Sequence, residues 1–191
     1  MRGRVEAVFK VAAHINLPRL TGVIGVAVFD DLLKANEGFS ASFDRGDVGM
    51  PPRRGVAIVT CMDARLHPET FLELDIGDAH VIRNAGGCTS DDAIRSLVIS
   101  QRLLGTNEVV VIHHTDCGML TFKNQELVDR IQDELGADAS GIDFLPFGEL
   151  EQSVLDDVET LRRSEFIPDE VSVAGAIYEV ETGRLHEITR K

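Results

Sequence analysis

The chain has 191 residues, of which 43% are hydrophobic and 27% charged, and its formal net charge is −13. This length suits a domain that buries its core without disulfides or a structural metal, and no apolar run is long enough to cross a bilayer. The negative charge disfavours a nucleic-acid-binding surface, because a polyanion would be repelled over most of the protein. We therefore expect a soluble globular protein with no nucleic-acid or membrane partner.

The chain contains three cysteines, Cys61, Cys88 and Cys117, an odd number at wide spacing. The N-terminal sequence begins with basic residues, but Lys10 and His14 interrupt its apolar stretch, which is unlike a secretory signal. A disulfide framework is therefore disfavoured. We expect a reducing, cytoplasmic location with metal-binding or reactive thiols.

The first part of the chain predicts an extension followed by the main fold. Residues 1–27 are interpreted as an N-terminal extension, and residues 28–191 as a single zinc-dependent catalytic domain. A helix is expected over 30–39. The turn-rich segment 45–55 then leads into the regular part of the fold.

Three short apolar runs predict buried strands, at 55–60, 79–87 and 108–114. Helices are expected between them. The one over 68–74 starts at a proline, and the one over 90–105 has a serine as N-cap and a glycine as its stop.

Two amphipathic helices and a hairpin complete the predicted elements. The apolar stripes of the helices are Leu127, Val128, Ile131 and Leu135 in the first, and Leu150, Val154, Val158 and Leu161 in the second. Residues 171–188 alternate and turn at "ETGR", which indicates a hairpin or edge pair. The predicted fold is an α/β domain with an open, mainly parallel β-sheet flanked by helices and a C-terminal edge strand or hairpin.

Three polar clusters follow the three predicted parallel strands. Cys61 follows the first strand, Arg83–Gly87 end the second, and His114–Cys117 follow the third. The carboxyl ends of parallel strands meet at one edge of a sheet, where ligands bind in open α/β folds. We therefore expect these clusters to lie together.

Two cysteines and a histidine offer the ligands of a zinc site. Cys61, His114 and Cys117 would supply two thiolates and one imidazole, a set that suits zinc. Three protein ligands with an open fourth position are typical of a catalytic site. Adjacent strand residues face opposite ways, so only one of His113 and His114 could bind the metal, and spacing alone allows either.

Asp63 and Arg65 lie next to the proposed ligand Cys61, in "CMDAR". A zinc site with two thiolates is nearly neutral and lowers the pKa of a bound water only weakly. A carboxylate that accepts a hydrogen bond from the zinc-bound hydroxide, and a guanidinium that orients this carboxylate, would assist the reaction. If Arg65 released it, Asp63 could close the site as a fourth ligand. The plain alternative is a surface ion pair.

Several of these residues can also be explained by structural roles alone, without a catalytic or metal-binding role. A cysteine at a strand end is usually a small buried hydrophobe, and Cys88, which has no partner at useful spacing, is expected to be structural. "RNAGG" is a strand-exit turn first and a wall of the site second. Asp116 is expected to be a loop or helix-start acceptor.

The motifs "CMDAR", "RNAGG", "DDAIRSL" and "HHTDCGM", in this order, resemble the β-class carbonic anhydrases, specifically the small branch found in archaea and actinobacteria. The resemblance covers about residues 28–191. It implies Cys61, His114 and Cys117 as ligands of one Zn²⁺ per chain, with Asp63 and Arg65 as the catalytic pair.

The resemblance also implies an activity and an assembly. The activity is reversible hydration of carbon dioxide to bicarbonate and a proton by zinc-bound hydroxide, which makes the expected enzyme a carbonate dehydratase, a lyase. Family members form homodimers or larger assemblies such as tetramers, with N-terminal helices that embrace the partner. Residues 1–27 would serve as such an oligomerisation arm.

Two alternatives share this ligand motif. One is a carbonyl sulfide or carbon disulfide hydrolase of the same fold, whose substrates are also linear, uncharged and attacked at carbon. The other is a non-catalytic zinc-binding or redox-sensing module, in which the cysteines exchange between metal and disulfide.

Overall fold

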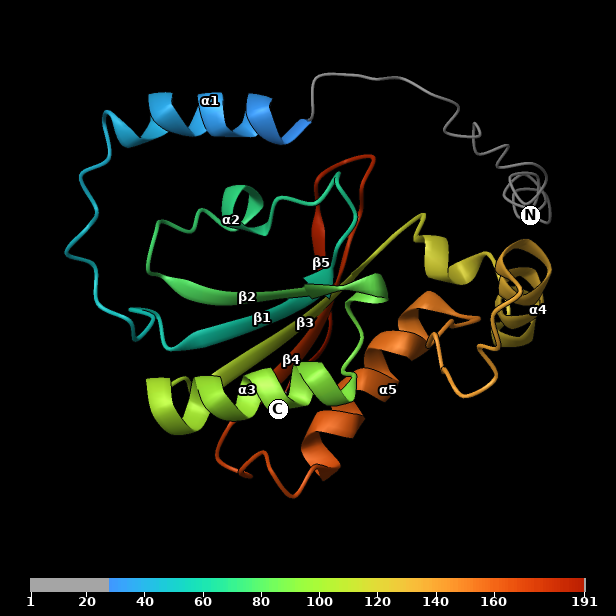
Figure 1. The fold of residues 1–191 in the computed structure, drawn as a ribbon. Coiled ribbons are helices and arrows are strands. Elements are labelled where there is room, and N and C mark those ends of the chain that lie inside the picture. The colour runs from blue at the N-terminus through green and yellow to red at the C-terminus, as the bar shows by residue number, and fades with distance from the viewer. Residues whose placement is uncertain (1–27, 191) are drawn as a thin grey trace, which may run out of the picture. The chain divides into compact units, whose positions relative to one another are not determined.

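The computed structural model describes residues 28–190 of the chain (Figure 1). The chain divides between Asp47 and Val48 into two compact units, each of which is described by itself. In the first unit, α1 (Val28–Ser40) confirms the helix expected over 30–39. The predicted oligomerisation arm, residues 1–27, lies outside the described residues.

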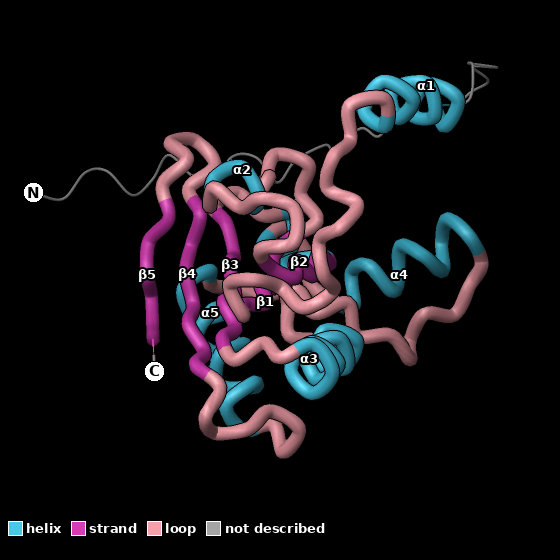
Figure 2. The backbone as a smooth tube through the Cα atoms, turned by 90° about the vertical axis from the view of Figure 1, so that its left-hand side faces the viewer, coloured by secondary structure: helices cyan, strands magenta, loops and turns pink. Residues whose placement is uncertain are grey.

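The second unit is built on a five-stranded sheet with the order β2-β1-β3-β4-β5 (Figures 1 and 2). Its first four strands run parallel, and the last pairs antiparallel with β4. The strands are β1 (Val56–Cys61), β2 (Ala79–Asn84), β3 (Glu108–His114), β4 (Ser172–Tyr178) and β5 (Leu185–Arg190). The predicted α/β fold with a C-terminal antiparallel edge strand is confirmed.

Helices cover the two faces of this sheet unequally. The helices are α2 (Pro68–Phe71), α3 (Asp91–Leu104), α4 (Asn124–Leu135) and α5 (Leu150–Arg163), with short 3₁₀ turns η1 (Ala85–Gly87) and η2 (Gly118–Leu120). Helices α3 and α5 pack on one face and α2 lies over the other (Figure 1). No helix within residues 28–190 combines the length and the hydrophobicity needed to cross a bilayer.

The central strands β1, β3 and β4 are mostly apolar because both faces of the sheet are buried there, whereas the outer strands β2 and β5 are partly exposed and carry polar side chains. In β1, Ala57 and Val59 face the core under α3 and α5, whereas Ile58 belongs to the core on the α2 side. The predicted caps of α3 are present: the Ser90 side chain accepts a hydrogen bond from a backbone N–H, and Gly105 is left-handed. These elements place the ends of β1, β2 and β3 side by side.

Two helices depart from the predicted pattern. Helix α2 ends at Phe71 rather than at residue 74, and Glu73 has a left-handed φ of 51°. The chain leaves the helix there because Leu72 and Leu74 pack against the sheet, so tertiary burial overrides helical propensity. In α4, Leu135 is 76% exposed, so the predicted apolar stripe is buried only in part.

Candidate metal centre

Three side chains that can bind a metal meet at the carboxyl edge of the sheet. The ligand atoms of Cys61, His114 and Cys117 all lie within 4.8 Å of one another, and all three residues are buried. Cys61 ends β1 and His114 ends the adjacent parallel strand β3. Cys117 follows after a two-residue turn, so strand pairing and one turn bring the cluster together.

The His114 ring presents a bare nitrogen to this cluster. Its Nδ1 lies 2.8 Å from the carbonyl oxygen of Thr115, which can only accept, so Nδ1 carries the proton. In the neutral ring, Nε2 then has a free lone pair. This atom is buried and has no hydrogen-bond partner, which is costly unless a metal occupies it.

The two thiols also fit a cation. A hydrogen bond from Cys117 lowers the pKa of the Cys61 thiol to about 4, and the same contact raises the pKa of Cys117. The pair therefore favours one thiolate, because two adjacent negative charges repel in a buried site. A divalent cation would remove that repulsion, and zinc prefers this set of two sulfurs and one nitrogen.

Asp63 and Arg65 form a bidentate pair beside the cluster. Nε and Nη2 of Arg65 donate to the two carboxylate oxygens of Asp63 at 3.0 and 2.7 Å, and the Arg65 backbone N–H donates at 2.8 Å. These hydrogen bonds hold the pKa of Asp63 at about 2 and raise the pKa of Arg65. Asp63 Oδ2 lies 3.9 Å from His114 Nε2, so this carboxylate faces the cluster.

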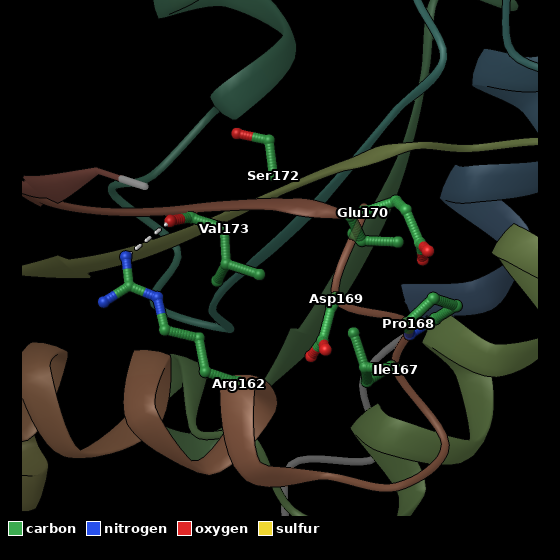
Figure 3. Close-up of a pocket in the computed structure, with 8 residues that line it drawn as sticks. Arg162, Ile167, Pro168, Asp169, Glu170, Ser172 and Val173 are labelled. Atoms are coloured by element: carbon green, nitrogen blue, oxygen red, sulfur yellow. Dashed lines mark hydrogen bonds between the residues drawn. The ribbon is translucent and has the colours of Figure 1, made fainter.

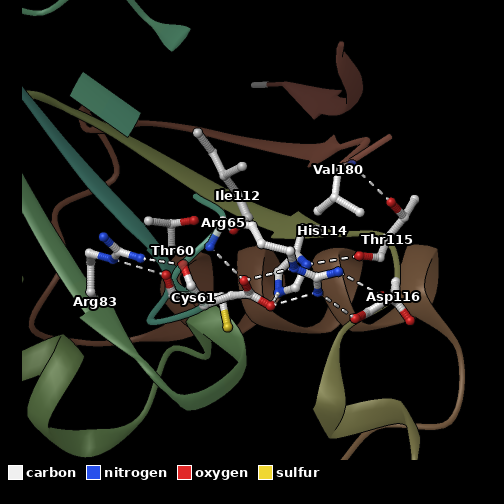
Figure 4. A network of polar contacts seen from close by, with 10 residues as sticks. Thr60, Cys61, Arg65, Arg83, Ile112, His114, Thr115, Asp116 and Val180 are labelled. Carbon is white, nitrogen blue, oxygen red and sulfur yellow. Dashed lines mark hydrogen bonds and ion pairs between the residues drawn. The ribbon is translucent and has the colours of Figure 1, made fainter. Parts of the chain in front are cut away.

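Asp116 has a partner that the sequence did not indicate. Its carboxylate accepts a hydrogen bond from Nη1 of Arg65 at 2.7 Å, and its carbonyl accepts one from Nη2 at 3.0 Å (Figure 4). Asp116 is thus the loop acceptor that was expected as one alternative, and not a helix-start acceptor, because the N-cap of η2 is Cys117 and the turn has no side-chain cap. No sequence signal joins two residues 51 positions apart.

Arg83 lies at the edge of the sheet where its cluster was expected, but the sequence assigned it no role. From the adjacent strand β2, its Nε donates to the carbonyl of Cys61 at 3.0 Å and its Nη2 to the carbonyl of Asp63 at 2.7 Å (Figure 4). Arg83 therefore fixes the backbone that carries one cluster residue and the acid. Its place at the end of a strand next to β1 was the available signal.

The glycines of "RNAGG" allow this backbone to approach closely. Gly87 has a φ of +76°, and a Cβ there would lie 2.9 Å from the backbone nitrogen of Cys61. A Cβ at Gly86 would lie 2.8 Å from the Cys88 sulfur. The turn is thus both a strand exit and a wall of the site.

We expect Gly87→Ala to lower the free energy of unfolding by about 2–4 kcal/mol, because it combines left-handed strain with a backbone clash. Denaturant titration of the metal-free protein measures this. Gly105→Ala is the matched control, since Gly105 has the same φ of +76° but a Cβ there meets nothing within 4 Å. Equal stability of the two variants would contradict the close approach.

His113 and Cys88 lie outside the cluster, as expected. His113 is fully buried on the opposite face of the sheet, with Nδ1 2.7 Å from Ser153 Oγ and Nε2 2.9 Å from Asp157 Oδ2. Burial raises the pKa of the Cys88 thiol to about 12, so it stays protonated. Both residues therefore have the buried, structural role that was expected.

A separate pocket of about 180 Å³ lies at the opposite, amino end of β4 (Figure 3). It is lined by Arg162 and residues 167–173, and Arg162 donates a hydrogen bond to the Val173 carbonyl at 3.0 Å. It contains none of the predicted site residues. The candidate chemistry is therefore at the other end of the sheet.

Comparisons with known proteins agree with this geometry. The family model described as carbonic anhydrase matches residues 56–185. Beta-carbonic anhydrase 1 of Mycobacterium tuberculosis is 45% identical over 168 residues, which cover 86% of this chain and 99% of that protein. A carbon disulfide hydrolase of Saccharolobus solfataricus is 36% identical over 181 residues, 83% of this chain and 87% of that one.

Among solved structures, a carbonic anhydrase from Streptococcus mutans superposes with a TM-score of 0.84 at 47% identity, covering 87% of this chain and 100% of that chain. An apo form of carbon disulfide hydrolase has a TM-score of 0.64 at 33% identity, covering 85% and 90%. Sequence and fold comparisons thus point to the same family.

Proposed function

The chain belongs to the β-class of the carbonic anhydrase family, and we propose that it hydrates carbon dioxide reversibly to bicarbonate and a proton, using one Zn²⁺. The observation that carries this proposal is the buried cluster of Cys61, His114 and Cys117, with its unpartnered nitrogen. Zinc held there would supply a nucleophile from water at neutral pH.

Asp63 and Arg65 would orient the reacting water. Asp63 stays ionised because its pKa is about 2, so Oδ2 can accept a hydrogen bond from the water while facing the cluster. Arg65 occupies both carboxylate oxygens and keeps the acid from turning inward. Arg83 would hold the ligand Cys61 and the acid Asp63 in place, because it donates hydrogen bonds to the backbone carbonyls of both residues.

Stopped-flow measurement of carbon dioxide hydration by the zinc-loaded protein tests the proposal. The rate should exceed that of the metal-free protein and fall when zinc is chelated. A zinc-loaded protein that is no faster than the metal-free one would contradict it.

A second candidate is hydrolysis of carbon disulfide or carbonyl sulfide. The observation that favours it is the 36% identity to a carbon disulfide hydrolase over most of both chains. Sulfide release from either compound, measured beside carbon dioxide hydration on the same zinc-loaded sample, separates the two. Sulfide release with little hydration would replace the first proposal.

A non-catalytic zinc or redox module is less consistent with the site. A zinc store needs no bidentate acid and guanidinium beside the cluster, and Cys88, with a pKa of about 12, is a poor thiolate for disulfide exchange. We expect one zinc per chain that survives mild oxidation, measured by metal analysis with thiol titration. Reversible loss of zinc on oxidation would favour the sensor.

Self-association as a homodimer or tetramer is also part of the proposal. Helix α1 has no buried residue, and its apolar Phe29, Leu32 and Leu33 are exposed. In the second unit, a pocket of about 420 Å³ on the α2 side of the sheet exposes apolar strand residues such as Val110. Apolar surface of this kind is typical of an interface.

We expect Phe29→Glu to shift the assembly toward monomers, because a charge on this apolar side opposes burial. Light scattering after size exclusion measures the molar mass. Lys34→Glu, at another exposed position of α1, is the matched control and should leave the mass unchanged. A wild-type protein of monomer mass would refute the proposed self-association.

A cytoplasmic location is proposed from the thiols. Cys61, Cys88 and Cys117 are all free, and the cluster needs reduced sulfurs to bind zinc. Fractionation of the source cells with an antibody to the protein tests this.

A further inference from the structure

The guanidinium of Arg65 is shared between two acids. Nε and Nη2 donate to Asp63, as described above. The remaining terminal nitrogen, Nη1, donates to Oδ2 of Asp116 at 2.7 Å, and Nη2 also donates to the Asp116 carbonyl at 3.0 Å (Figure 4). Asp116 therefore binds the donor that Asp63 leaves free.

Asp116 is held in place by the turn that links His114 to Cys117. Its φ is +57°, a left-handed conformation that aspartate adopts more readily than most residues. Thr115 fixes the start of the turn, since its N–H donates to the Tyr178 carbonyl at 3.0 Å and its Oγ1 accepts from the Val180 N–H at 3.1 Å. The backbone that presents two cluster residues thus also presents this carboxylate.

Global stability does not account for this contact. The Asp116 side chain is 72% exposed, and exposed ion pairs contribute under about 1 kcal/mol. A planar guanidinium with several fixed donors does, however, lose its freedom to rotate. Asp116 acts on the orientation of Arg65, and Arg65 acts on Asp63.

We propose that Asp116 is a positioning residue that holds Arg65 where it engages both oxygens of Asp63. Asp63 Oδ2 is 3.9 Å from His114 Nε2, so a carboxylate freed from Arg65 is near enough to become a further metal ligand. Asp116 thereby keeps one coordination position available to an external ligand. This inference rests on the proposed metal site.

Cobalt(II) in place of zinc gives a test that does not depend on turnover. The d–d absorption of the cobalt protein is titrated with thiocyanate, which reports whether a coordination position is accessible. Asp116→Gly keeps the left-handed backbone and removes the carboxylate, whereas Asp116→Asn keeps an oxygen that can accept from Nη1. Arg65→Ala provides the spectrum expected when Asp63 is unrestrained.

We expect thiocyanate to bind about three- to fivefold more weakly to Asp116→Gly, the largest effect that an exposed ion pair can transmit. Asp116→Asn should lie between this variant and the wild type. Coulomb's law alone predicts the opposite sign, because removing a negative charge near the site favours an anion. Weaker binding is therefore specific to positioning.

The control is Asp92→Asn, which alters an exposed aspartate paired with Arg95 at 2.8 Å outside the site and should leave the titration unchanged. Wild-type or tighter thiocyanate binding by both Asp116 variants would overturn the proposal while leaving the metal site intact. A wild-type protein that takes up no cobalt would overturn the metal site itself, and this inference with it. The two failures are thus distinguishable.

Discussion

Cys61→Ser is expected to abolish zinc binding and to reduce carbon dioxide hydration to the rate of the metal-free protein. The hydrogen bond with Cys117 lowers the pKa of the Cys61 thiol, so this contact favours a thiolate, the form that binds zinc. A serine hydroxyl stays protonated at that pH and is a poor zinc ligand. Metal analysis and stopped-flow kinetics on the same sample measure both losses.

Cys88→Ser is the matched control for this variant. Cys88 is equally buried, but it is not part of the cluster and burial raises its pKa to about 12. The control should keep one zinc per chain and its activity, with some loss of stability from a buried hydroxyl. Full zinc content and activity in Cys61→Ser would contradict the assigned ligand set.

Arg65→Ala is expected to lower kcat/KM for carbon dioxide hydration by about 10²- to 10³-fold, the range for loss of one preorganised donor, while zinc content stays at one per chain. Without Arg65, both oxygens of Asp63 lose their side-chain donors and the acid is free to turn toward the cluster. Zinc analysis separates this effect from loss of the metal.

The pH dependence of this defect follows from the pKa of Asp63. Arg65 holds that pKa at about 2, below the usual value, so the carboxylate is ionised above this pH. Removing Arg65 raises the pKa toward about 4, which still leaves the acid ionised near neutrality. The loss of kcat/KM in Arg65→Ala should therefore be similar at every pH from about 6 to 9.

Two variants bracket the interpretation of Arg65→Ala. Arg65→Lys should be impaired as well, because an ammonium cannot bridge both oxygens of Asp63 and reach Asp116. Arg95→Ala, which removes another exposed arginine of an aspartate pair, should retain activity. Near-normal kcat/KM in Arg65→Ala would leave Asp63 and Arg65 as a surface ion pair without a part in catalysis.

The fold and the cluster were predicted from two kinds of pattern in the sequence, continuous apolar runs and the alternation of side chains along a strand. Continuous apolar runs indicated strands buried on both faces; the structure confirms three strands, of which β1 and β3 are buried and the edge strand β2 is only partly so. Alternation along β3 required His113 and His114 to face opposite sides, which the contact of His113 with Asp157 bears out. The family resemblance then selected His114.

The features that the sequence did not predict depend on tertiary contacts and not on a repeating pattern of residues. The end of α2 at Phe71 depends on Leu72 and Leu74 packing against the sheet. The contacts of Arg83 depend on which strand lies beside β1.

By itself, the sequence placed Cys61, Cys117 and one of the two adjacent histidines at one edge of the sheet, where the carboxyl ends of parallel strands meet, and the family resemblance selected His114. Only the tertiary structure decided that Arg65 is held by Asp116 as well as by Asp63. That contact forms because the left-handed backbone at Asp116 directs its carboxylate toward Arg65, which lies 51 positions earlier in the chain. Strand pairing is governed by repeating backbone hydrogen bonds, whereas a contact between two loops depends on the individual torsion angles of each.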